Sequence, residues 1–158
     1  MSGYSWSMPP AAPATSTSGP ERVRQRDRFW GRDLWLDVRT AGADLVTTAA
    51  KDLAIVEGED CLRQALIRRI ITTPGEWATL PEYGCGARLY IKARNTPATR
   101  AELAERIRAQ LSREPRVERV QTVSIQTTDQ GGLKINVIVV PRGRLRPDAL
   151  LPISLEVN

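Results

Sequence analysis

The chain has 158 residues, a length typical of one domain, and 41% of them are hydrophobic, enough for an ordinary buried core. It carries 23 Lys and Arg against 18 Asp and Glu, a net charge of +5, and this scattered charge predicts solubility and association rather than a nucleic-acid groove. The absence of histidine excludes Ser-His-Asp and Cys-His nucleophilic sites, and two cysteines are too few for a structural zinc site.

The first segment, residues 1–28, is predicted to be a flexible arm before a domain at residues 29–158. Its first 20 residues carry no charge and are rich in Ser, Pro, Ala and Thr, so they cannot bury enough apolar surface to offset their ordering entropy. The segment lacks the basic start and apolar core of a signal peptide. We expect Tyr4 and Trp6 to anchor the arm on a partner, because large aromatic side chains supply contact area; the alternative is an arm without a partner.

The first half of the predicted domain combines a strand, a helix and a loop. Residues 32–38, RDLWLDV, alternate like a strand, with Leu34, Leu36 and Val38 on one face. The mixed pattern of residues 41–58 indicates extended chain or loop. A helix is predicted over 59–71, because its leucines and isoleucines are spaced four apart and its acidic start and basic end suit the helix dipole. Residues 72–87 are punctuated by proline and glycine, which predicts a long loop.

The second half predicts one helix and three strands. Thr96 is a candidate N-cap before Pro97 at the first helical position, and Pro115 ends the helix. Residues 117–127 and 133–141 alternate as an antiparallel hairpin, and the second strand is expected to be central and covered on both faces. Residues 150–157 predict a last strand, placed at the edge by Pro152. The expected fold is therefore α+β, a three-stranded antiparallel sheet packed with two helices and preceded by the extended arm.

Several motifs in this order resemble one protein family. The loop carries its pattern at Thr73, Gly75, Glu76, Pro81, Tyr83 and Gly84; Glu114-Pro115-Arg116 is similar to its hallmark tripeptide, and Gly31-Arg32-Asp33 to its N-terminal start. Over about residues 30–158 the chain resembles the baseplate wedge proteins, or sheath initiators, of contractile phage tails and related injection systems, the family named for protein W and the gene-25 product. The uncharged extension at residues 1–20 does not belong to the common pattern.

The resemblance implies a structural protein without catalytic residues, metal or cofactor. It implies a place at the inner baseplate, after assembly in the bacterial cytoplasm, where the protein links the wedge to the first sheath ring and starts the sheath by strand exchange. The implied partners are the sheath protein, other wedge proteins and possible inner tube or hub proteins, with six copies in each particle. The scattered charge predicts no nucleic-acid partner, and the longest apolar run, from Ile135 to Val140 apart from Asn136, is too short to predict membrane insertion.

The last predicted strand supports this function from its own residues. A three-stranded sheet has open edges, and an unpaired edge is a template for another chain. We expect no further element after residues 150–157 to cover this strand, and it is therefore expected to bind a partner with Ile153, Leu155 and Val157. The alternative is a strand that only completes the protein's own sheet.

Two charged segments are further candidates for partner binding. Pro115 holds Glu114 and Arg116 in a fixed relation at the helix-to-strand corner, where we expect them to bind a partner by charge-assisted hydrogen bonds. The alternative is a helix stop with two solvated charges, a pair worth only about 0–1 kcal/mol. Arg142, Arg144 and Arg146 share one side if extended and would form a docking strip for an acidic surface, or a solvated loop.

Two rival functions are weaker interpretations of the same residues. The sequence pI of 9.8 favours a nucleic-acid-binding module, which steep salt dependence of DNA or RNA retention would reveal. Glu76 and Glu82 beside Trp77 and Tyr83 suggest a glycosidase-like carboxylate pair, although such loop residues usually serve packing. Cys85 has no histidine to activate its thiol, and both cysteines are expected to be free thiols in a reducing compartment.

Overall fold

The larger sheet of the protein has three antiparallel strands in the order β5 (Val117–Thr127), β6 (Leu133–Pro141), β7 (Leu151–Val157). These strands come from a computed structural model that describes residues 29–39, 42–91, 96–129, 131–143 and 149–157. The three strand predictions are confirmed, the last with a start one residue later, because Gly131-Gly132 and Pro152 mark the turn and the edge locally. The α+β fold class is confirmed as well.

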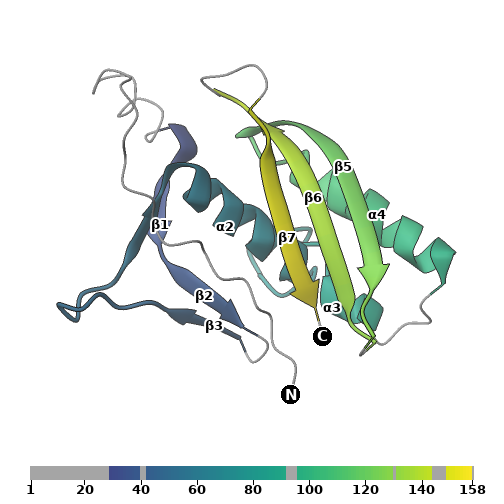
Figure 1. The fold of residues 1–158 in the computed structure, drawn as a ribbon, viewed down its shortest axis with the longest axis horizontal. Helices are drawn as coiled ribbons and strands as arrows, with labels where there is room; N and C mark the ends of the chain where they lie inside the picture. The colour runs from purple at the N-terminus through teal and green to yellow at the C-terminus, as the bar shows by residue number, and fades with distance from the viewer. Residues whose placement is uncertain (1–28, 40–41, 92–95, 130, 144–148, 158) are drawn as a thin grey trace.

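Two long helices, α2 (Gly58–Ile71) and α4 (Pro97–Leu111), pack against one face of this sheet. Thr96 caps α4 as predicted, since its hydroxyl accepts a hydrogen bond from the Thr99 N–H at 3.1 Å. Their apolar stripes form the core with the inward residues of the three strands, and α2 lies between the sheet and the N-terminal strands (Figure 1). No helix in the described part of the chain is long and apolar enough to span a membrane.

A third helix, α3 (Ala87–Ile91), follows the long loop and was not predicted. It has only five residues, too few to show a hydrophobic period in the sequence. Ala87 is fully buried and joins the same core as α2 and α4.

The N-terminal strands form two short antiparallel pairs, β1 (Arg32–Leu34) with β4 (Ile55–Glu57) and β2 (Leu36–Arg39) with β3 (Gly42–Leu45). The prediction of one strand over residues 32–38 is therefore wrong, because the strand is divided at Trp35. Leu34 is 38% exposed, whereas Leu36 packs against the core. The two residues do not share the buried face that their alternation predicted.

The central strand β6 is buried mainly on one face. Ile135, Val137 and Val139 are at most 1% exposed and point into the core. On the opposite face Lys134 is exposed, and Asn136 and Ile138 are half-buried. The prediction that both faces are covered is thus wrong over most of the strand, because all the helices of the core lie on one side of the sheet.

Candidate functional site

The Glu114-Pro115-Arg116 corner joins the end of α4 to β5 and turns both charged side chains inward. The Glu114 side chain is 9% exposed and that of Arg116 is 20% exposed. Arg116 Nε donates to Glu114 Oε1 at 2.6 Å, and Arg69 Nη2 of α2 lies 3.6 Å from Glu114 Oε2. Only Pro115, between them, is exposed.

In this arrangement the pKa of each group moves in the direction that favours its charged form. Burial raises the pKa of the Glu114 carboxyl, but the hydrogen bond and charge of Arg116 and the charge of Arg69 outweigh it, so the pKa lies below its ordinary value. Burial lowers the pKa of Arg116, yet the hydrogen bond and charge of Glu114 raise it above the usual range. The pair therefore stays ionised inside the protein.

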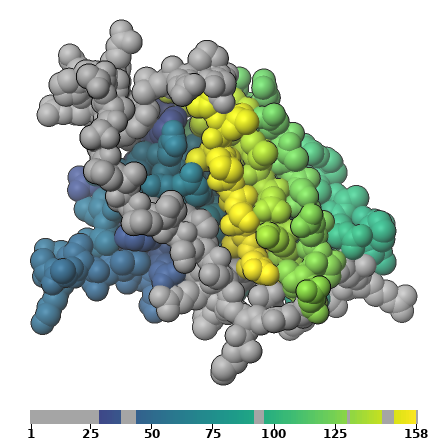
Figure 2. Space-filling view, in the orientation of Figure 1, coloured from purple at the N-terminus to yellow at the C-terminus, as the bar shows by residue number. Residues whose placement is uncertain are grey.

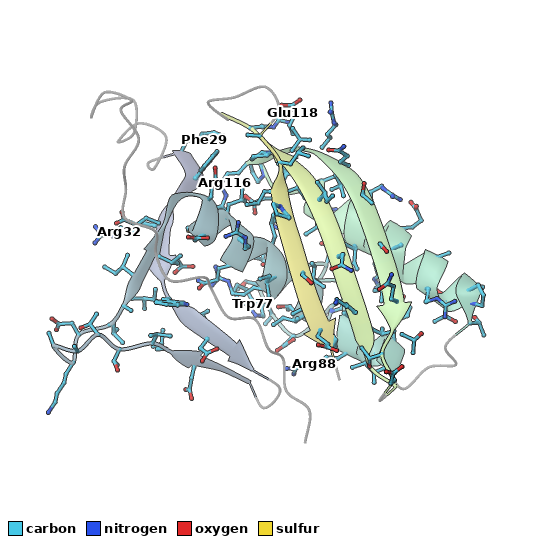
Figure 3. The ribbon with its side chains drawn as sticks, in the orientation of Figure 1. Phe29, Arg32, Trp77, Arg88, Arg116 and Glu118 are labelled. Atoms are coloured by element: carbon cyan, nitrogen blue, oxygen red, sulfur yellow. The ribbon has the colours of Figure 1, made fainter. Side chains whose placement is uncertain are left out.

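The corner also holds the N-terminal motif in place. Arg116 Nη1 donates to the Trp30 carbonyl at 2.7 Å, and Figure 3 shows Arg116 and Phe29 at the same end of the molecule. Gly31 has φ +90°, and a Cβ there would lie 3.3 Å from Arg116 Nη1, so the close approach of the backbone favours glycine. The N-terminal motif and the Glu114-Pro115-Arg116 corner thus form one cluster, although Arg32 and Glu114 are 82 residues apart in the sequence.

Several members of this cluster were not predicted from sequence. Trp30 is 1% exposed and donates from Nε1 to the Arg142 carbonyl at 2.8 Å. Arg68 Nη2 lies 2.6 Å from Asp33 Oδ2, which ties α2 to the N-terminal motif. The only signal for Arg68 in the sequence is the basic last turn of α2, which the helix dipole already explains, and no local pattern indicates the role of Trp30.

The solvated pair considered as an alternative at this corner does not occur. Its assumed value of about 0–1 kcal/mol applies to exposed ions, whereas Glu114 and Arg116 are mostly withdrawn from water. Both have partners within the chain, so stability is a good reason for the tripeptide. Partner binding by the corner stays a prediction.

The loop motif folds on itself and lies against α2. Glu76 Oε2 accepts a hydrogen bond from the Thr73 N–H at 2.9 Å, and the Gly75 N–H donates to the Pro81 carbonyl at 2.8 Å. Gly84 has φ +106°, and a Cβ there would lie 2.2 Å from the Thr72 carbonyl oxygen, so only glycine fits.

The two loop carboxylates have partners within the chain, and the two thiols are buried. Glu76 accepts from the main chain, and Glu82 pairs with Arg113 at 3.2 Å, so they do not form the free carboxylate pair that a glycosidase needs. Cys61 and Cys85 are buried free thiols. Burial raises the pKa of Cys85 to about 12, which makes it unreactive near neutral pH.

Many of the basic side chains that the structure describes are paired with acids. Among the described residues seven arginines lie within 4 Å of a carboxylate: Arg32, Arg63, Arg68, Arg69, Arg108, Arg113 and Arg116. Paired arginines offer less free charge to a phosphate backbone. The pairs therefore give no support to the nucleic-acid interpretation.

Strand β7 lies at one edge of the sheet, and its side chains are divided between the core and the surface. Ile153, Leu155 and Val157 are at most 2% exposed and pack into the protein's own core. Figure 2 shows β7, in yellow, along the surface of the face turned to the viewer. Because the apolar side chains are already buried, a partner would meet this strand through its main chain.

The register of β7 shows which main-chain groups point outward. Its pairing with β6 is unbroken from Leu133–Val157 to Val139–Leu151 and includes Ile138–Pro152. Opposite residues of an antiparallel pair exchange two hydrogen bonds or none, and Pro152 has no N–H to donate. Pro152, and with it Ser154 and Glu156, therefore directs its main-chain groups away from β6.

The outer edge of β7 is thus open in the part of the chain that the structure describes. No described strand pairs with it. Arg63 Nε donates a long hydrogen bond, at 3.4 Å, to the Pro152 carbonyl, which is one of the outward main-chain groups of this edge. The N–H groups of Ser154 and Glu156 remain as donors for an added strand.

The opposite edge, β5, is less regular. Its pairing with β6 shifts register between Val117 and Arg119 and again between Val120 and Thr122. Such bulges twist an edge strand and interrupt its row of hydrogen-bonding groups, a common protection against unwanted pairing. Of the two edges, β7 is the better template.

The comparisons with known proteins agree with this architecture. The model of a family described as "Contractile injection system sheath initiator" matches residues 32–141. The chain belongs to this family. It is also similar in fold to a chain in the cryo-EM structure of the anti-feeding prophage (AFP) baseplate, 6-fold symmetrised, with a TM-score of 0.53 and 23% identity over 65% of this chain and 83% of that chain. No curated protein matches the chain.

For this sheath initiator the resemblance inferred from the motifs is confirmed. The matched residues contain Arg32 and Asp33 of the N-terminal motif, the loop and the corner, whereas Gly31 and β7 lie outside them. Arg142 belongs to the corner, because its N–H donates to the Arg116 carbonyl at 2.7 Å and its Nε to the Val117 carbonyl at 3.1 Å. Tyr4, Trp6, Arg144 and Arg146 lie outside the described residues, and their partner-binding roles stay predictions.

Proposed function

We propose that this sheath initiator is a structural part of the baseplate of a contractile particle and that it starts the sheath by accepting one strand of a first-ring sheath subunit at β7. The family description, which names sheath initiation, supports the general role. The observation that carries the finer proposal is the regular, unpaired outer edge of β7, with the N–H groups of Ser154 and Glu156 directed away from β6.

The remaining partners follow from the same role. A baseplate position implies contacts with other wedge proteins and with the tube or hub at its centre. The similar fold in a baseplate described as 6-fold symmetrised supports six copies in each particle. Because Glu114 and Arg116 are satisfied within the chain, we assign the corner first to holding the domain together; any partner there would meet the exposed Pro115.

One substitution separates the main chain of β7 from its side chains. Ser154→Pro removes an N–H that points away from β6, so no hydrogen bond between β6 and β7 is lost. A proline also favours extended backbone in the residue before it, and Ile153 is already in a strand. We expect particles with this variant to form baseplates but few or no sheathed tails, counted by electron microscopy in a strain whose only copy carries the change.

Ser154→Ala is the matched control. Both variants lose the 2.8 Å hydrogen bond between Ser154 Oγ and Asn136 Oδ1, but only Ser154→Pro loses the N–H. Circular dichroism and thermal unfolding of both purified variants check that the fold is retained. Full-length sheaths on Ser154→Pro baseplates would rule out strand addition at this edge.

A further inference from the structure

An open pocket lies on the helical side of the molecule, away from the β7 edge. It has a volume of about 540 Å³, within the range of about 300–1,000 Å³ typical of ligand sites. Its walls come from Arg69 in the last turn of α2, from the loop at residues 79–83, and from Gln110 of α4 with Arg113 just beyond the helix. No residue of β7 contributes to it.

Contacts of the lining residues with one another and with Trp77 position the loop beside the pocket. Trp77 and Tyr83 stack with ring centroids 5.4 Å apart and an interplanar angle of 17°, and the Arg69 guanidinium carbon lies 4.4 Å from the Tyr83 ring centroid. Gln110 Nε2 donates to the Glu82 carbonyl at 2.8 Å, which fixes the loop to α4. The shape is therefore available before any partner binds, which lowers the entropy lost on binding.

The lining combines an apolar wall with a charged rim. Leu80 is 50% exposed, and Pro81 and the Tyr83 ring extend this apolar surface. At the rim Arg113 pairs with Glu82, and both side chains are more exposed than buried, at 56% and 82%. An exposed pair of this kind is weak and can exchange its carboxylate for that of a partner.

Two polar atoms of the lining residues lack a hydrogen-bond partner among the described residues. Arg69 Nε is a donor, and Gln110 Oε1 is an acceptor. Buried polar groups normally have a partner, and a missing one costs about 1–3 kcal/mol. Both atoms are buried, so they add no contact for a partner, and docking depends on the apolar wall and Arg113.

We propose that this pocket is a second docking site, which holds a large apolar side chain of a partner protein segment flanked by an acidic residue that binds Arg113. The apolar side chain would cover Leu80 and Tyr83, and the acid would compete with Glu82 for the guanidinium. The inference goes beyond strand addition at β7 and places a different partner segment on the helical layer. It predicts that the chain contacts two neighbours through separate surfaces.

Two synthetic peptides with blocked ends test the proposal on the full chain: Asp-Trp-Leu-Asp and Lys-Trp-Leu-Lys. We expect the acidic peptide, at about 1 mM, to shift the amide NMR signals of Leu80, Tyr83 and Gln110, and the basic peptide to bind more weakly. Leu80→Ser should weaken the acidic peptide about tenfold, because it removes apolar area from the contact. Arg113→Glu should weaken it about two- to fivefold and reverse the preference between the peptides.

Leu53→Ser is the matched control, since Leu53 is 47% exposed in the segment between β3 and β4, does not line the pocket, and should leave binding unchanged. Absence of shifts in the pocket signals would overturn the proposal. Equal binding of both peptides to the original chain and to Arg113→Glu would do the same. The experiment contains no sheath protein, so its outcome is independent of the test of strand addition.

Discussion

Glu114 keeps its charge in the interior because two arginines from different elements surround it. Arg116 Nε lies 2.6 Å from one carboxylate oxygen and Arg69 Nη2 3.6 Å from the other. Removal of one partner from a buried ion pair leaves the other charge desolvated without compensation. The tripeptide therefore acts on stability first, through side chains that join α2, β5 and the N-terminal segment.

Replacement of Arg116 measures this contribution. Arg116→Met should lower the free energy of unfolding by about 3 kcal/mol, because Glu114 and the Trp30 carbonyl both lose their donor. Urea unfolding followed by circular dichroism gives the value. Arg32→Met, which breaks an exposed pair with Glu57, should change stability by less than about 1 kcal/mol; equal losses in the two variants would refute a buried role for Arg116.

Glu114 also predicts how stability depends on pH. Its pKa is lower in the folded protein than the ordinary value of 4.5, so below that value the unfolded chain takes up the proton first. The stability contributed by Glu114 is present above pH 4.5 and is lost as the pH falls through the folded pKa. Unfolding free energies measured from about pH 7 to pH 3 should decline less steeply for Glu114→Gln than for the original chain. An unchanged slope would assign the acid sensitivity to other carboxyl groups.

At the scale of elements, local signals were sufficient for the long helices and the larger sheet. Pro97 and Pro115 bracket α4, and the double glycine at Gly131-Gly132 marks the turn before β6. These signals act within a few residues, so the sequence contains them directly. They gave element bounds within one residue for α2, β5, β6 and β7.

The N-terminal strands could not be predicted in the same way, because their geometry depends on a distant side chain. Gln64 of α2 is 1% exposed; its Oε1 accepts from the Leu36 N–H and its Nε2 donates to the Leu34 carbonyl, both at 2.9 Å. The amide thus binds the main chain on both sides of Trp35, where β1 ends and β2 follows. Alternation alone suggested one strand, since it contains no trace of a partner about 30 residues away.

The candidate site was predictable in position but not in orientation. The tripeptide and the loop motif could be found in the sequence, yet the burial of Glu114 and Arg116 depends on Trp30 and Arg69, which only the tertiary fold brings together. In β7 the alternation correctly gave Ile153, Leu155 and Val157 one face, but that face belongs to the protein's own core. In the proposed strand addition, the groups that would face the partner are the outward main-chain atoms of Ser154 and Glu156.

Across the whole molecule, the helices cover one face of the sheet, and the two edges differ. Bulges interrupt β5, whereas β7 keeps an unbroken register beside its open side. A protein that must add a strand from another chain needs one edge that is accessible and regular, and a second edge that does not aggregate. Under the proposed strand addition, this asymmetry would direct the partner strand to β7 rather than to β5.

Hydrogen–deuterium exchange at single-residue resolution tests the central proposal most directly. The amides of Ser154 and Glu156 should exchange rapidly in the free chain and slowly after purified sheath subunit is added, because an added strand would bond to both. The amides of Ile153 and Leu155, which face β6, should be protected in both states and serve as internal controls. Unchanged, rapid exchange at Ser154 and Glu156 in the sheath-bound chain would contradict strand addition at β7.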